Sequence, residues 1–171
     1  NAAKKMRLFV SGSAPMLPQT HDLWKERTGK IILERYGMTE TSMNTSNPYH
    51  GERRSGTAGL ALPGIEVIVT DTETGQVLQD GRTGMIEIRG PNVFKGYWGM
   101  PEKTAEELRE NGFFITGDLG MISEDGYVSL VGRSKDLIIS AGYNIYPKEI
   151  ELLIDCIDGV FESAVIGVPH P

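Results

Sequence analysis

The sequence predicts a mixed α/β fold (α+β mixed), in which a strand–helix–strand unit precedes an antiparallel β module. Three observations lead to this class. Apolar runs flank one helical stretch within the first 35 residues, short strands separated by Gly- and Asp-containing turns fill the middle, and a helical pattern returns after Lys135. The 171 residues suffice for one ordinary domain with a core of its own.

The first unit begins with a buried strand over residues 7–10, followed by a loop over residues 11–15. Residues 18–28 have helical spacing, with Leu23 and Trp24 apolar among charged neighbours and Gly29 as the stop signal. Residues 31–35 form the next strand. A strand, a helix and a strand in this order are typical of a parallel α/β unit.

The middle of the chain alternates apolar and polar residues over 65–70 and 85–89, and again over 120–122 and 127–131. The turns "DTETG" and "SEDG" separate such runs, as in antiparallel sheets. A helix interrupts the module at "PEKTAEELRENG". It has Pro101 in the first turn, Thr104 and Glu107 at capping-box spacing, and Gly112 as the stop.

The last part starts at "GRSKD", which we interpret as the boundary between a domain over residues 1–134 and a second one over 135–171. "SAGYN" is expected to be a loop, and Pro147 opens a helix that ends at Gly159. Residues 160–168 are expected to form a strand. Because apolar strand-like runs lie directly at both ends, we expect the chain to be an internal part of a longer protein.

The net charge, the apolar runs and the cysteine count restrict the classes of partner and compartment that we expect. The net charge is −6, which argues against nucleic acid as a partner, and no apolar run approaches the roughly 20 residues of a membrane span. The single Cys156 excludes an internal disulfide, which suits the cytoplasm, or the mitochondrial matrix in a eukaryote. We expect Cys156 to be a buried structural thiol, and His21, His50 and His170 to be surface residues.

The first two of four polar, glycine-containing loops offer groups for a nucleotide. Gly12 in "SGSAP" permits close approach of a flat ligand, although an ordinary turn would have the same composition. In "ERYGMTETS", Tyr36 could stack on a base, Thr39 and Thr41 could donate to phosphate oxygens, and Glu40 could hold Mg²⁺. The alternative is a threonine that caps a short helix.

The other two loops follow later in the chain. Asp118 in "TGDLG" could accept hydrogen bonds from a ribose diol, or simply belong to an Asp-containing turn. In "GRSKDLIISAGYNIYPKEIE", Arg133 and Lys135 could meet anionic groups, and Gly142 could let a narrow substrate pass. The alternative is a solvated charge cluster between two domains.

The order of these motifs is more specific than any one of them. "SGSAP", "YGMTET", "GRTGMIEIRGPNVFKGYW", "TGDLG" and "GRSKDLIISAGYNIYPKEIE" together resemble the adenylate-forming superfamily of acyl-CoA synthetases, luciferases and peptide-synthetase adenylation domains. "TSMNTSNPYHGERRSGTAG" and "GPNVFKGYWGMPEKT" are most similar to its malonate–CoA ligases. The resemblance implies the C-terminal part of the large domain and the beginning of the small one.

The resemblance also implies a reaction. A carboxylic acid, with malonate as the expected one, is activated with ATP and Mg²⁺ to an acyl-adenylate, and CoA then displaces AMP. The implied catalytic residues are Thr39 at the phosphate, Glu40 on Mg²⁺ and Lys135 at the hinge of the small domain. The implied nucleotide and CoA contacts are Ser11, Gly12, Ser13, Ala14, Pro15, Glu34, Arg35, Tyr36, Gly37, Met38, Thr39, Asp118, Arg133, Gly142 and Tyr143.

Two lysines of the family do not occur in the sequence: the one in a Gly/Ser/Thr-rich phosphate loop and the one in a Pro…Gly-Lys context. We therefore expect the chain alone to be inactive. Arg53 and Arg54 are candidates for the distal carboxylate of malonate, or are solvated loop residues. Methylmalonate, a short fatty acid or an aryl acid remains an alternative substrate, and a noncatalytic AMP-binding or scaffolding module an alternative function.

Overall fold

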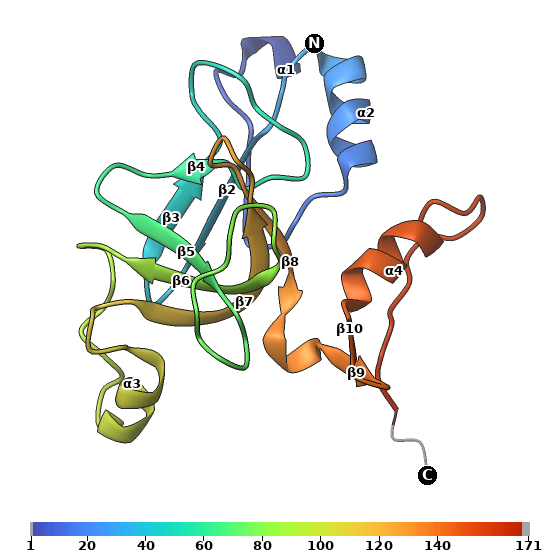
Figure 1. Cartoon of the computed structure of the whole chain (residues 1–171). Coiled ribbons are helices and arrows are strands. Elements are labelled where there is room, and N and C mark those ends of the chain that lie inside the picture. Colours follow the sequence, from blue (N-terminus) through green and yellow to red (C-terminus); the bar gives the residue numbers. More distant parts are fainter. Residues whose placement is uncertain (1, 169–171) are drawn as a thin grey trace.

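The computed structural model describes residues 2–168, which form two four-stranded sheets, a two-stranded sheet and four α-helices (Figure 1). The hairpin β9–β10 and helix α4 stand to one side of the two larger sheets. The first elements are α1 (Ala2–Lys5), β1 (Val10–Ser11), α2 (Pro18–Thr28), β2 (Leu33–Met38), β3 (Ser42–Ser46) and β4 (Leu60–Ala61). They are followed by β5 (Glu66–Thr70), β6 (Gly84–Arg89), α3 (Pro101–Glu107), β7 (Phe114–Ile122), β8 (Val128–Arg133), the 3₁₀ turn η1 (Ser134–Asp136), β9 (Ile138–Ser140), β10 (Tyr143–Ile145) and α4 (Pro147–Ile154).

The first sheet has the order β1-β2-β3-β4 and contains the predicted parallel unit, since β1 pairs with β2 in parallel. Helix α2 has the predicted bounds, with Gly29 in the left-handed conformation at its C-terminus. The strand expected at 7–10 is shorter and less buried: β1 has two residues and Val10 is 45% exposed, because β2 is its one neighbour within the described residues.

Strand β2 begins at Leu33 and extends beyond the predicted end at residue 35, so most of the motif "ERYGMTETS" is strand rather than loop. Its partner β3 is polar and gave no strand signal. The pairing shifts register between Tyr36 and Gly37. A Cβ on Gly37 would lie 2.0 Å from the carbonyl oxygen of Ser42, so no other residue fits this close approach of β3.

The second sheet is an antiparallel meander in the order β5-β6-β7-β8, which confirms the predicted β module. Ile86 and Ile88 on β6 are fully buried and pack with Val128 on β8. Strand β7 covers "TGDLG", so Asp118 lies within a strand and not in the loop that the sequence suggested.

Helix α3 begins at the predicted Pro101 but has no capping box. Its N-cap residue is Met100, and Thr104 lies inside the helix. The Thr104 hydroxyl accepts the N–H of Tyr97 at 2.9 Å and donates to the carbonyl of Met100 at 2.9 Å. The helix ends at Glu107, before the predicted Gly112, because Leu108 already bridges to Phe114 at the start of β7.

The part after η1 differs most from expectation. "SAGYN" is the turn of the hairpin β9–β10, in which Ala141 and Gly142 both have positive φ, as a tight two-residue hairpin turn requires. Helix α4 stops at Ile154 rather than at Gly159. Residues 160–168 are not a strand, since no strand within the described residues pairs with them, and Phe161 is 99% exposed.

Two predicted burials are reversed. Cys156 is exposed, and its sulfur accepts a hydrogen bond from Gln19 Nε2 at 2.9 Å, because the turn that follows α4 faces the start of α2 rather than a core. His21 is buried on α2, whereas His50 is exposed and His170 lies outside the described residues. Among the described helices, none is long and apolar enough to cross a membrane.

An ion pair between the exposed Arg109 and the buried Glu87 links the α3–β7 connection to β6. Glu87 on β6 is fully buried, and both of its carboxylate oxygens accept hydrogen bonds at 2.7 Å from Arg109. The hydroxyl of Thr70 donates to the same carboxylate at 2.7 Å. Each oxygen of this buried carboxylate therefore has at least one donor, and its negative charge faces the guanidinium of Arg109.

Replacing Arg109 tests this arrangement. Arg109→Ala leaves a buried carboxylate with only the Thr70 hydroxyl, so we expect the free energy of unfolding to fall by about 3 kcal/mol, measured by urea denaturation. Glu66→Gln is the matched control, because it breaks the exposed pair with Arg89 and should change stability little. Equal effects of the two substitutions would contradict the role of the Arg109–Glu87 pair.

Candidate functional site

A cavity of about 850 Å³ lies between the two large sheets and the part of the chain after β8. Residues from each of the four polar loops line it. From the predicted site these are Ser11, Ser13, Ala14, Pro15, Glu34, Arg35, Tyr36, Gly37, Met38, Asp118, Arg133 and Lys135. Gly12, Thr39, Glu40, Gly142 and Tyr143 are outside the lining. The structure thus brings together most, but not all, of the residues that the sequence suggested.

Asp118 is the carboxylate at the centre of this site. Strands β7 and β8 place it opposite Arg133, whose Nε is 2.8 Å from Asp118 Oδ1. The hydroxyl of Tyr36 on β2 donates to Oδ2 at 2.5 Å. Each oxygen therefore has one protein donor and keeps a lone pair for a ligand, as recognition of two adjacent hydroxyls requires.

Burial sets the electrostatics of Asp118. It raises the pKa of the carboxyl group, while the hydrogen bond from Tyr36 and the charge of Arg133 lower it. The charge of Glu40 raises the pKa of Asp118 further, so the two carboxylates sense each other although Glu40 does not line the cavity. Burial and the neighbouring Asp118 also raise the pKa of Tyr36, which keeps its phenol a donor.

Glu34 is a second buried carboxylate in the cavity wall. It is 7% exposed, and its Oε1 has no hydrogen-bond partner within the described residues. Burial raises the pKa of Glu34, whereas the charge of a protonated His21 and the backbone N–H groups of Met16 and Gly56 lower it. Since an unpaired buried acceptor is costly, Oε1 is suited to take a donor from a ligand.

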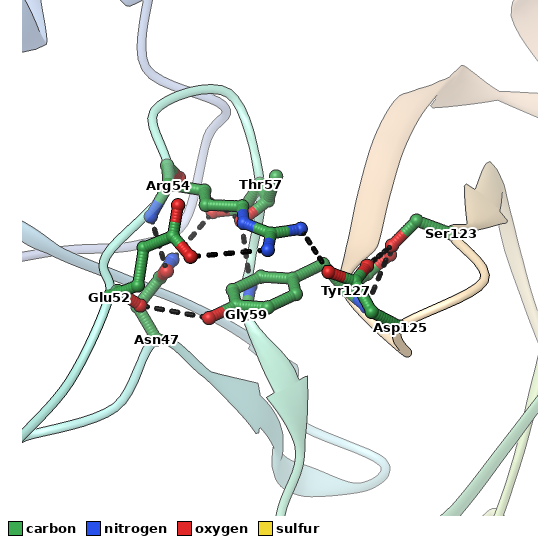
Figure 2. A network of polar contacts seen from close by, with 8 residues as sticks. All are labelled: Asn47, Glu52, Arg54, Thr57, Gly59, Ser123, Asp125 and Tyr127. Carbon is green, nitrogen blue, oxygen red and sulfur yellow. Dashed lines mark hydrogen bonds and ion pairs between the residues drawn. The ribbon is translucent and has the colours of Figure 1, made fainter.

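The loop over residues 47–59 supplies a part of the wall that the sequence did not suggest. Its residues Gly56, Thr57 and Ala58 line the cavity. Asn47, which is buried, donates to the carbonyl of Thr57 at 2.8 Å and accepts the N–H of Arg54 at 2.9 Å (Figure 2). These two hydrogen bonds connect the start of the loop to its second half, so this part of the cavity wall has a defined shape.

Arg54 fastens the same loop to the β7–β8 turn. Its guanidinium lies between Glu52 and Asp125, at 3.2 and 2.6 Å, and over the ring of Tyr127 at 4.0 Å (Figure 2). Arg53 donates to three backbone carbonyls, those of Ile31, Pro48 and Tyr49. Neither arginine lines the cavity, so their suggested binding of a substrate carboxylate stays a prediction.

Glu40 lies beside the cavity in the turn between β2 and β3. Its Oε1 accepts a hydrogen bond from the hydroxyl of Tyr97 at 3.2 Å. The described residues contain no group of three or more His, Cys, Asp or Glu side chains that could hold a metal ion alone. Mg²⁺ in nucleotide sites takes one or two carboxylates and completes its shell with phosphates and water, so a single carboxylate fits that ion.

Helix α4 adds two residues that sequence reasoning missed. Lys148 and Glu151 line the cavity opposite Asp118, and Lys148 Nζ is 3.3 Å from Glu151 Oε2. Glu151 also accepts the N–H of Val165 at 3.1 Å. Lys135 faces the cavity from η1, whereas Tyr143 is 75% exposed on the hairpin. The one available signal was the "PKEIE" sequence, which places a lysine and a glutamate on one face of a helix.

Removing the Tyr36 hydroxyl tests the electrostatics. We expect Tyr36→Phe to raise the pKa of Asp118 further, because the carboxylate loses a donor that stabilises its charged form. The stability that Asp118 contributes is greatest below its unfolded-state pKa and is lost as pH rises through the folded-state pKa, so the loss moves to higher pH. Carboxyl ¹³C NMR titration measures the pKa, and Tyr127→Phe is the control. A lowered pKa of Asp118 in Tyr36→Phe would contradict this account.

The curated proteins that the chain is similar to include CoA ligases. It is 41% identical over 166 residues to a long-chain-fatty-acid–CoA ligase of Yersinia pestis, covering 96% of the chain and 29% of that protein. It is 40% identical over 168 residues to a malonate–CoA ligase of Arabidopsis thaliana, covering 98% and 27%. The chain thus spans less than a third of the length of these relatives.

Solved structures share its fold. ATP-bound MatB from Rhodopseudomonas palustris matches with a TM-score of 0.94 and 65% identity, over 96% of this chain and 33% of that one. A malonyl-CoA ligase complex with methylmalonyl-CoA and AMP matches with a TM-score of 0.68 and 45% identity, over 96% and 35%. The AMP-binding enzyme family matches residues 1–98. The predicted resemblance is therefore confirmed, and the chain belongs to the AMP-binding enzyme family.

Proposed function

We propose that the protein containing this chain is an acid–CoA ligase. It activates malonate with ATP to malonyl-AMP and transfers the malonyl group to CoA, giving malonyl-CoA, AMP and pyrophosphate. The observation that carries the proposal is the one cavity that gathers Tyr36, Asp118 and Arg133 with a wall formed by Ser11, Ser13, Ala14 and Pro15. The CoA ligases among the relatives support the reaction class, and the malonate–CoA ligase and malonyl-CoA ligase among them support malonate.

The nucleotide would be held by complementary polar groups. Asp118 accepts hydrogen bonds from the two ribose hydroxyls, in an orientation that Tyr36 and Arg133 fix. Glu34 and Arg35, together with Tyr36, flank the adenine. Glu34 offers an oxygen without a protein partner, which can accept a hydrogen bond from an amine.

The phosphates would lie toward the β2–β3 turn. Thr39 donates its hydroxyl to a phosphate oxygen, and Glu40 holds Mg²⁺. When bound, the ion would neutralise the negative charge that develops on the α-phosphate during adenylation, as the acid's carboxylate displaces pyrophosphate. The protein's own contribution is to keep donors and carboxylate in place before reaction, which avoids reorganisation during the step.

The second half-reaction would need a rearrangement of residues 135–171 against residues 1–134. Lys135 sits in η1, a three-residue turn between β8 and β9, where few dihedral angles have to change to rotate the following part. Rotation would bring Gly142 and Tyr143, now outside the cavity, toward the adenylate to form the channel for the thiol of CoA.

Other acid substrates and a noncatalytic role are the alternatives to malonate activation. The fatty-acid ligase of Yersinia pestis is as similar as the malonate–CoA ligase, so a monocarboxylic substrate is the first rival. Methylmalonate and aryl acids are further rivals. A noncatalytic AMP-binding or scaffolding module would keep the Asp118 cluster without turnover, and its nucleotide would remain unchanged in the presence of any acid.

An acid panel decides among these. We expect the complete polypeptide that contains this chain to form the hydroxamate of malonate in preference to those of methylmalonate, butyrate, a long-chain fatty acid and benzoate, in a hydroxylamine-trapping assay with ATP. Preference for a monocarboxylate would count against malonate, and no product with any acid would favour the binding module.

A matched pair of variants connects this activity to the site. Asp118→Asn should raise the KM for ATP with every acid, because the amide has a single accepting oxygen for the ribose hydroxyls. Asp80→Asn, on the exposed turn before β6, should behave as the unmodified protein.

The 171-residue chain alone should show no malonate-dependent release of pyrophosphate. Thr39 and Glu40 would face the phosphates of bound ATP from one side only. The two lysines that the resemblance implies for the other side are not in the sequence. A coupled pyrophosphate assay on the purified chain, with the complete polypeptide as positive control, checks this. Turnover by the chain would show that those lysines are dispensable.

A further inference from the structure

Residues 94–97, "FKGY" of the motif "GPNVFKGYW", do not line the cavity, yet they contact Glu40 twice. The N–H of Phe94 donates to the carbonyl oxygen of Glu40 at 2.8 Å. The hydroxyl of Tyr97 reaches the side chain of the same residue, at 3.2 Å from Oε1. Both the backbone and the carboxylate of Glu40 are therefore held by one segment that is more than 50 residues away in sequence.

The phenol of Tyr97 lies between two carboxylates. It is 2.6 Å from Oε2 of Glu107 on α3 and 3.2 Å from Oε1 of Glu40. A phenol has one hydrogen to donate, and an oxygen of each carboxylate lies within hydrogen-bond distance of it, so Glu40 and Glu107 share Tyr97 as a donor. Glu107 thus holds the phenol beside Glu40, and because Glu40 has no ion pair within the described residues, its charge remains available to a cation.

The ring of Tyr97 cannot easily move away. It packs edge-to-face on Phe94, with ring centroids 4.8 Å apart, and Phe94 packs in the same way on the buried Phe114. The N–H of Tyr97 donates to the hydroxyl of Thr104 on α3 at 2.9 Å. The ring, the backbone and the hydroxyl are thus each anchored, so the oxygen that faces Glu40 has a fixed position.

Gly96 makes this anchoring possible. Its φ is +136°, and a Cβ there would lie 2.6 Å from the methyl group of Thr104. Any other residue would push the segment away from α3. The order Gly96–Tyr97 is therefore needed for the phenol to reach both carboxylates, which gives a physical reason for "KGYW" in this sequence.

We propose that Tyr97 is a positioning residue that, anchored by Glu107, holds the carboxylate of Glu40 for the divalent cation accompanying ATP. This inference rests on the proposed function, since it takes Glu40 as the carboxylate that meets Mg²⁺. Groups that orient a metal-binding carboxylate typically change metal affinity by about 10- to 100-fold when removed. Tyr97 acts through Glu40 and has no contact of its own with the cation.

The test uses Mn²⁺ as a spectroscopic substitute for Mg²⁺. Binding of Mn²⁺ to the complete polypeptide with α,β-methylene-ATP is measured by EPR, so the readout does not depend on turnover. We expect Tyr97→Phe to raise the Mn²⁺ dissociation constant by about 10- to 100-fold, with the KM for malonate unchanged. Tyr49→Phe, at a half-exposed tyrosine outside the site, is the matched control and should bind Mn²⁺ normally.

Two further variants separate the possible failures. Glu40→Gln should weaken Mn²⁺ binding at least as much as Tyr97→Phe. Normal binding in Glu40→Gln would overturn the role of Glu40 and this inference with it, whereas weak binding in Glu40→Gln with normal binding in Tyr97→Phe would overturn the inference alone. If Tyr97→Phe does not fold, Phe94→Leu serves instead, because it removes the ring on which Tyr97 packs and leaves both carboxylates intact. It should weaken Mn²⁺ binding by a smaller factor, and unchanged binding there would also overturn the inference.

Discussion

The hydrogen bond from Tyr36 to Asp118 joins the two large sheets in the wall of the cavity. Tyr36 belongs to β2 in the first sheet, while Asp118 and Arg133 belong to β7 and β8 in the second. Because Tyr36 also packs in the core with Ile86 and Ile88, the hydrophobic contact between the sheets and the geometry of the carboxylate are coupled. A shift of either sheet would therefore change both the core and the site.

The sequence predicted those helices and strands whose start, end and periodicity are set by residues within the element itself. Helix α2 was predictable from its proline start and Gly29, and the antiparallel module from alternation and Asp/Gly turns. Features that depend on distant partners were not. The irregular pairing at Gly37 depends on β3, whose polar sequence did not predict a strand. The left-handed backbone of Ala141 in the β9–β10 turn could not be predicted from its residue type, since alanine rarely adopts it.

The site shows the same division. Each polar loop alone was compatible with an ordinary turn, and only the order of the loops, through the family resemblance, selected Tyr36 and Asp118. No sequence pattern could show that Arg53 and Arg54 are occupied by loop carbonyls and by Asp125, because those partners lie in other segments. Likewise, Glu34 looks like any strand glutamate until its burial is known.

The two carboxylates of the candidate site differ in a way that suits different tasks. Asp118 is buried and already paired with Arg133, so the pair is close to neutral and suited to accepting hydrogen bonds from uncharged hydroxyls. Glu40 has no ion pair within the described residues, and its donor Tyr97 is closer to Glu107. A carboxylate whose charge is not compensated attracts a cation more strongly than one that is paired. The protein thus assigns the roles by what surrounds each carboxylate, since the chemical groups are the same.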